Sequence, residues 1–209
     1  MKVLILNGSP HLKGNCRQLI NEMINVFTSL DVQTDVVEVG TISGRGCIAC
    51  GYCHTHDDGC VLKDAVNDTN KLFKEADGLV IVSPVYFGSP NGNLISFLDR
   101  LFYSRHHDTR YKVGAAFAVA RRAGTTASFD MLNKYFTIAG MPVVSGDYWN
   151  NGFGREQGEI QDDLEGLRNA RIVAKRMVFL MKAIKDGKAN YSELLDDEPR
   201  VATHFIKNK

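Results

Sequence analysis

Runs of apolar residues alternate along the chain with segments in which apolar residues recur every three or four positions. The apolar runs predict β-strands at residues 2–6, 32–39, 78–83, 112–120 and 142–145. The segments with helical spacing predict helices at residues 15–30, 64–75, 91–102, 125–139 and 161–185, with Asp64 as the N-cap of the second. The runs at 78–83 and 112–120 are almost wholly apolar, which is typical of strands buried on both faces.

The regular alternation of strand and helix predicts an α/β fold. Parallel strands joined by right-handed helical crossovers form a sheet with helices on both faces. Five strands in one domain fit the flavodoxin-like doubly wound sheet, with strand order 2-1-3-4-5. We expect this domain at residues 1–186, with a Cys-rich insertion at about 40–63 and a tail at 187–209 that forms no separate domain. Ligands in such sheets bind beyond the carboxyl ends of the strands, between strands 1 and 3.

Composition and charge narrow the classes of function. The 209 residues carry a formal net charge of +1, so no overall field points to nucleic acid or to a membrane surface as a partner. No apolar run approaches the roughly 20 residues of a membrane helix. The start of the chain, MKVLILNGSP, is interpreted as a buried strand rather than a signal peptide, because Asn7 interrupts the apolar run. We therefore expect a cytoplasmic protein.

The loop after the first predicted strand is rich in hydrogen-bond donors. It leads into a helix, whose first backbone N–H groups are unpaired and whose dipole favours an anion. A phosphate is the expected ligand, although a polar turn that only caps the helix is an alternative. The spacing matches neither a Walker loop nor G-x-G-x-x-G. The candidate phosphate-binding residues are Ser9, His11, Gly14, Asn15 and Cys16.

The loop after the third predicted strand combines aromatic residues with two prolines and two glycines. Prolines stiffen such a loop, and glycines let its backbone approach a ligand closely. The candidate contacts for a flat aromatic cofactor are Pro84, Val85, Tyr86 and Phe87. The alternative is an aromatic cluster that packs on the following helix.

The loop after the fourth predicted strand reads ARRAG. Its small residues, Ala120 and Gly124, permit close approach of a ligand, and Arg121 or Arg122 could meet a phosphate or a second anionic ligand. Solvated arginines at a strand end are the alternative.

Four of the five cysteines lie in the stretch CIACGYCHTHDDGC, with the spacing C-x2-C-x2-C-x6-C. Clustered cysteines in a reducing cytosol favour metal binding or catalysis over disulfides. Four thiolates can hold one [4Fe–4S] cluster or a zinc ion, with His54 or His56 as alternative zinc ligands. Free thiols at the rim of another site remain an alternative. The candidate metal ligands are Cys47, Cys50, Cys53 and Cys60.

A resemblance to a known family is carried by four segments together: LNGSPHLKGNC, SPVYFGSPNGNLISFLDR, AVARRAG and WNNGFGREQGEIQDDLEG. Over about residues 1–180 the chain resembles the NADPH-dependent FMN reductase family, and within it most closely the branch of iron–sulfur flavoproteins. The resemblance implies a tightly held FMN, with its phosphate in the loop after the first strand and its ring against the loop after the third. Cys16 stands where the family usually has threonine.

The function that the resemblance implies is electron transfer from NAD(P)H through FMN to a small-molecule or protein acceptor. The [4Fe–4S] cluster of the iron–sulfur branch would give the electrons a further exit. No catalytic side chain is required, because the flavin carries the chemistry. A homodimer or homotetramer is expected. Two alternatives are an electron-transfer flavoprotein that does not oxidise NAD(P)H directly and a thiol-based redox sensor.

Overall fold

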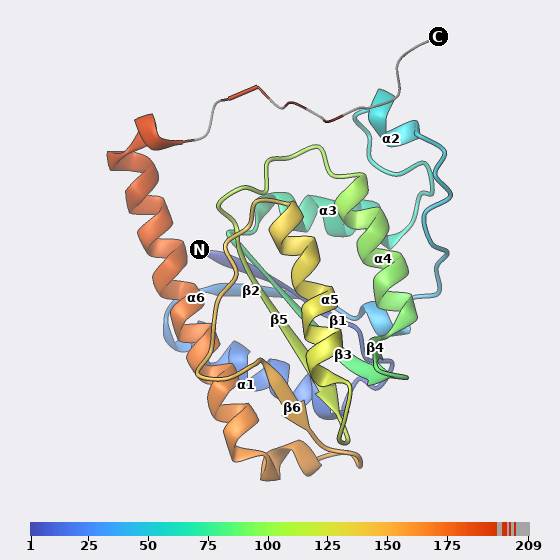
Figure 1. The fold of residues 1–209 in the computed structure, drawn as a ribbon, viewed down its shortest axis with the longest axis vertical. Helices are drawn as coiled ribbons and strands as arrows, with labels where there is room; N and C mark the ends of the chain where they lie inside the picture. The colour runs from blue at the N-terminus through green and yellow to red at the C-terminus, as the bar shows by residue number, and fades with distance from the viewer. Residues whose placement is uncertain (196–197, 200, 202, 204–209) are drawn as a thin grey trace.

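The computed structural model describes residues 1–195, 198–199, 201 and 203 (Figure 1). Its strands are β1 (Lys2–Asn7), β2 (Gln33–Val37), β3 (Gly78–Tyr86), β4 (Ser89–Pro90), β5 (Val113–Ala120) and β6 (Asn151–Phe153). Its α-helices are α1 (Asn15–Ser29), α2 (Tyr52–Thr55), α3 (Ala65–Glu75), α4 (Gly92–Tyr103), α5 (Thr125–Ile138) and α6 (Leu164–Asn190). Short 3₁₀ helices lie at η1 (Val39–Thr41), η2 (Glu159–Asp162) and η3 (Ser192–Leu194).

The strands pair in the order β2-β1-β3-β5-β6, and all of these pairs are parallel. Strand β4 lies off this path and pairs antiparallel with the end of β3, where Tyr86 faces Ser89. Without this hairpin the order is the predicted 2-1-3-4-5, which confirms the flavodoxin-like doubly wound sheet. Asp64 caps α3 as predicted, because its side chain accepts the N–H of Val66.

The fifth strand was predicted at residues 142–145, and this position is wrong. Only Val143 reaches the sheet, through an isolated bridge to Gly114, and the edge strand is β6. Between Val143 and β6 the chain leaves the sheet and contacts Asn169 of α6. The Asn169 side chain accepts the N–H of Asp147 at 2.9 Å and donates to Asn150 Oδ1 at 3.1 Å. These bonds hold the connection against α6 until pairing with β5 resumes at β6.

Two layers of helices cover the sheet (Figure 1). On one face, α1 and α6 pack on alternate strand residues such as Ile5, Val80 and Phe117. On the other face, α3, α4 and α5 pack on the intervening residues, such as Leu6 and Ile81. This alternation follows from the period of two in a β-strand. Both faces of the central strands are therefore buried, as their continuous apolar runs predict.

The final helix differs from the prediction at both ends. It begins at Leu164 and continues to Asn190, beyond the expected domain limit at residue 186. Part of the predicted tail lies outside the described residues, at 196–197, 200, 202 and 204–209. No helix in the described part of the chain is both long enough and apolar enough to cross a membrane.

Candidate functional site

A cleft lies where β1, β3 and β5 end, at the carboxyl edge of the sheet. Its volume is about 450 Å³, within the roughly 300–1,000 Å³ that small-molecule sites occupy. The cleft brings together most of the residues that the sequence nominates for a cofactor. Those lining it are Ser9, His11, Gly14, Asn15, Cys16, Pro84, Val85, Tyr86, Ala120 and Arg121.

One end of the cleft is formed by the start of α1. Gly14 is the N-cap, no side chain caps the helix, and its first turn holds no acidic residue. A tight turn leads into it, because Ser9 Oγ accepts the N–H of His11 at 3.1 Å and the His11 carbonyl accepts the N–H of Gly14 at 3.0 Å. The first backbone N–H groups of α1 therefore remain available to an anion in the cleft. This end fits a phosphate group.

The Cys16 side chain is buried beneath the same turn. Burial raises the pKa of its thiol to about 12, although the hydrogen bond with Ser9 acts in the opposite direction. The thiol therefore stays neutral at physiological pH and adds no negative charge where the anion would bind. Because a thiol is a weak donor, the backbone N–H of Cys16 is the better contact for a phosphate.

The Asn15 side chain is engaged with a second segment of the cleft and holds it in place. Its Nδ2 donates to the Glu156 carbonyl at 3.0 Å, and its Oδ1 accepts the N–H of Gly158 at 3.1 Å and of Ile160 at 3.4 Å. A phosphate at this end would meet the Asn15 backbone N–H rather than the side chain. The side chain links α1 to the segment that follows β6.

That segment forms one wall of the cleft, and its residues were not predicted as site residues from the sequence. Gly154, Arg155, Glu156 and Gln157 line the cleft together with Val119. Glu159 accepts the N–H groups of Arg155 and Glu156 at 2.6 and 2.9 Å, and these bonds lower the pKa of its carboxyl group. The available signal was the resemblance of WNNGFGREQGEIQDDLEG to a family loop. A polar, Gly-rich stretch has no local pattern that would mark single residues.

The other end of the cleft is formed by the hairpin of β3 and β4. Tyr86 lines the cleft, and partial burial raises the pKa of its hydroxyl group. Phe87 lies at the hairpin tip, outside the lining, with a fully exposed ring and a backbone φ of 51°. Gly124 is also outside the lining, in a left-handed conformation with φ of 86°, and a Cβ there would lie 2.8 Å from Gly88 Cα. Gly124 therefore permits the close packing that supports the hairpin.

A second pocket collects the four clustered cysteines. Cys47 and Cys50 are exposed, Cys53 and Cys60 are half-buried, and all four are free thiols. All of them line one small pocket, with a cavity volume of about 20 Å³. Within the described residues, no three His, Cys, Asp or Glu side chains already stand as a metal-binding group. The donor set and the shared pocket fit an S4 ligand set, the kind that holds a [4Fe–4S] cluster.

The two histidines of the cysteine segment lie outside this lining. His56 stacks on Tyr52, with ring centroids 3.9 Å apart, and His54 packs on Tyr103 at 4.8 Å. Their rings are thus engaged with aromatic neighbours. The pocket therefore favours the four thiols over a mixed set of cysteine and histidine ligands.

Helix α4 separates the two sites. Its first residue, Gly92, follows the β3–β4 hairpin that borders the cleft, and its last turn lines the cysteine pocket at Arg100 and Tyr103. A helix of 12 residues is about 18 Å long. The linings of the cleft and of the cysteine pocket have no residue in common.

The fold and the cleft together define the class of protein. A doubly wound parallel sheet with an uncapped helix start at the β1–β3 switch point is the arrangement in which flavodoxin-like proteins hold FMN. The model of the NADPH-dependent FMN reductase family matches residues 1–156. The chain belongs to this family and is an FMN-binding flavoprotein.

The relatives place the chain in the iron–sulfur branch. "Iron-sulfur flavoprotein MJ1083" of Methanocaldococcus jannaschii is 32% identical over 193 residues, which cover 88% of this chain and all of that protein. An "Iron-sulfur flavoprotein" of Methanosarcina thermophila is 28% identical, with coverage of 90% and 99%. Among solved structures, RosB with a bound 8-demethyl-8-formylriboflavin-5'-phosphate matches with a TM-score of 0.70 at 15% identity, over 100% of this chain and 93% of RosB. That likeness supports the fold.

Proposed function

We propose that the protein is an oxidoreductase that passes electrons from NAD(P)H through bound FMN to a small-molecule or protein acceptor, with a [4Fe–4S] cluster held by the four clustered cysteines. The observation that carries the proposal is the cleft, in which an uncapped helix start and an aromatic hairpin face one another in a chain of the FMN reductase family.

The residues of the cleft divide the binding of FMN between two ends. The backbone N–H groups at the start of α1, with Ser9 and His11 beside them, would hold the phosphate. The hairpin residues Pro84, Val85 and Tyr86 would support the ring. FMN supplies hydride and single-electron chemistry when bound, so the protein needs to provide orientation and charge rather than an acid or base.

Two arginines bring positive charge to the open side of the cleft. Arg121 follows β5 and Arg155 follows β6, and both are exposed at the lining, where Arg155 Nε pairs with Glu156 Oε1 at 3.1 Å and keeps its other N–H groups toward solvent. Exposed guanidinium groups suit the phosphates of a dinucleotide that arrives from solvent, because each can hold a phosphate through two N–H groups. We propose that these two residues receive NAD(P)H.

The proposed oligomer is a homodimer or homotetramer. Phe87 exposes its whole ring beside the cleft, and Tyr148 and Trp149 expose about half of theirs, with centroids 5.0 Å apart. Large exposed aromatic side chains are enriched at protein interfaces. Contact with a second copy would cover these exposed aromatic side chains.

Anaerobic purification tests the proposal in one preparation. We expect flavin absorption bands, broad additional absorption from a cluster, and about four iron and four sulfide ions per chain. Steady-state oxidation of NADPH or NADH with an artificial acceptor measures the activity. The double variant Cys47→Ser, Cys50→Ser is the matched control, because it should lose iron and retain FMN. Failure of the wild-type protein to bind FMN would overturn the proposed function. Stoichiometric FMN without turnover of either nicotinamide would favour an electron carrier.

A further inference from the structure

Arg100 is a buried charge at the end of α4 that faces the cysteine pocket. Its side chain is only 2% exposed, and it lies in the last turn of the helix. A buried guanidinium group is costly unless its N–H groups are paired. The partners of Arg100 therefore indicate the role of its charge.

One edge of the guanidinium group is paired with Asp64. Nη1 donates to Asp64 Oδ2 at 2.7 Å and Nη2 donates to Oδ1 at 2.9 Å, which is the two-pronged geometry of a strong ion pair. Backbone carbonyls add to this, since Nη2 donates to Leu62 at 3.2 Å and Nη1 to Arg45 at 3.4 Å. These contacts already compensate much of the buried charge.

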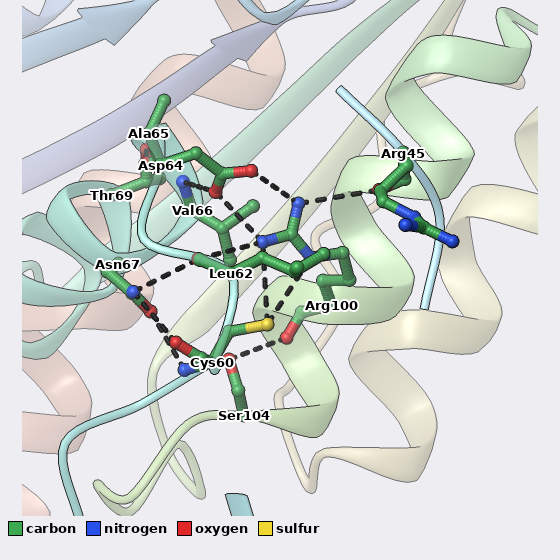
Figure 2. Close-up of polar contacts among 10 residues, drawn as sticks. All are labelled: Arg45, Cys60, Leu62, Asp64, Ala65, Val66, Asn67, Thr69, Arg100 and Ser104. Carbon is green, nitrogen blue, oxygen red and sulfur yellow. Dashed lines mark hydrogen bonds and ion pairs between the residues drawn. The ribbon is translucent and has the colours of Figure 1, made fainter. Parts of the chain in front are cut away.

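The other edge of the guanidinium group points at a cysteine. Nε and Nη2 each lie 3.4 Å from Cys60 Sγ, so the sulfur receives two N–H groups from one cation (Figure 2). The ion pair with Asp64 does not require this contact. It places a fixed positive charge beside one of the four sulfurs of the pocket.

Cys60 is itself held in place from the other side. Asn67 of α3 accepts the Cys60 N–H at 2.8 Å and donates to the Cys60 carbonyl at 3.0 Å (Figure 2). The residue before it, Gly59, has φ of 88°, and a Cβ there would lie 2.7 Å from Asn67 Oδ1. Cys60 therefore meets Arg100 from a fixed backbone, whereas Cys47 and Cys50 are exposed.

We propose that Arg100 is a positioning residue that donates two hydrogen bonds to the Cys60 sulfur of the bound [4Fe–4S] cluster and thereby raises the reduction potential of that cluster. This rests on the cluster in the proposed function. Hydrogen bonds to the sulfurs and nearby charge set such potentials. When the cluster takes up one electron from a mediator, no bond forms or breaks and its negative charge grows. A fixed cation at hydrogen-bond distance favours the reduced state.

Substitutions of Arg100 and Asp64 should shift the reduction potential in opposite directions. Arg100→Gln removes the cation, so reduction should become at least tenfold less favourable, which lowers a one-electron potential by about 59 mV. Asp64→Asn removes the opposing anion and leaves the cation, so the potential should rise. Arg100→Lys keeps the charge without the two-pronged donors and should fall between Arg100→Gln and the wild type. The matched control is Lys63→Gln, because Lys63 is an exposed cation of the same segment that pairs with Asp58. Its charge also acts on Cys60, but without a hydrogen bond and through solvent, which screens such an interaction.

The measurement is a redox titration of each purified variant under anaerobic conditions, followed by electron paramagnetic resonance, with iron content and thermal unfolding determined on the same samples. A lower potential for Arg100→Gln and a higher one for Asp64→Asn, with Lys63→Gln close to the wild type, would support the proposal. Equal potentials in Arg100→Gln and wild type would overturn it while the cluster stands. Loss of iron from all three Arg100 and Asp64 variants, with unchanged unfolding, would assign the pair to cluster assembly and also overturn it. Wild-type protein without iron and sulfide would refute the proposed cluster itself, and the inference with it.

Discussion

Replacement of Asn15 by alanine tests how the cleft is built. The side chain is 9% exposed and makes two hydrogen bonds near 3.0 Å and a third at 3.4 Å to the segment after β6. A typical hydrogen bond contributes about 0.5–1.5 kcal/mol net, so the two short bonds amount to about 1–3 kcal/mol. We expect Asn15→Ala to lower the free energy of unfolding of the FMN-free protein by this amount.

The variant should also bind FMN more weakly. Gly154, Arg155, Glu156 and Gln157 line the cleft, and without Asn15 the tether between them and α1 is lost. Urea unfolding followed by circular dichroism gives the stability, and quenching of FMN fluorescence gives the dissociation constant.

A matched control is available on the same helix. Gln18 also links α1 to the segment after β6, through a bond from Gln161 Nε2 to Gln18 Oε1 at 3.0 Å, but this bond is exposed to solvent. Substitutions at such surface sites usually change stability by less than about 0.5 kcal/mol. If Asn15→Ala unfolds at the same urea concentration as Gln18→Ala, the tether does not contribute as reasoned.

Three further predictions concern the surroundings of the two sites. Cys16→Ser adds a hydroxyl donor at the phosphate end of the cleft and should tighten FMN about tenfold, because hydrogen bonds to charged groups contribute about 1.5–3 kcal/mol; an unchanged constant in the fluorescence titration would place the phosphate elsewhere. Gly40→Ala should destabilise the fold by about 1–3 kcal/mol and reduce the FMN content of purified protein, because the added Cβ would collide with the Ser9 backbone. Gly44→Ala is the control and should change neither quantity, because a Cβ at Gly44 meets only open space. Burial, with nearby cations, lowers the pKa of His107 from 6.5 to about 4. The neutral ring therefore contributes to stability above pH 6.5, and this contribution is lost as the pH falls from 6.5 to 4. In urea titrations, the difference in unfolding free energy between wild type and His107→Gln should shrink over that pH window, and a constant difference would contradict the prediction.

The fold was predictable from sequence where burial leaves a continuous pattern. The apolar runs of β3 and β5 and the cap at Asp64 carry their structure in the local sequence. Strand β6 reads Asn-Gly-Phe and has no such pattern, because its place is set by pairing with β5 and by the contact of the preceding chain with Asn169.

The same distinction applies to the candidate sites. The loops after β1 and β3 could be nominated because their residue types show what they can bind. Arg100 could not, since an arginine in an amphipathic helix resembles a surface charge until the packing of α4 against the cysteine segment buries it. Phe87 illustrates the reverse case, because its sequence neighbours suggest a ring contact while the hairpin turns its side chain to solvent.

Gly40, at the start of the cysteine segment, packs against the Ser9 backbone of the loop after β1. The chain enters the cysteine segment directly beside the loop that would hold phosphate, with no room for a side chain between them. If iron loading shifts this segment and displaces Ser9, occupancy of one site alters the affinity of the other. Thermodynamic linkage requires such an effect to be reciprocal: the factor by which iron loading changes the FMN affinity must equal the factor by which FMN changes the affinity for the cluster. Either titration, performed with and without the other ligand, yields the same coupling free energy.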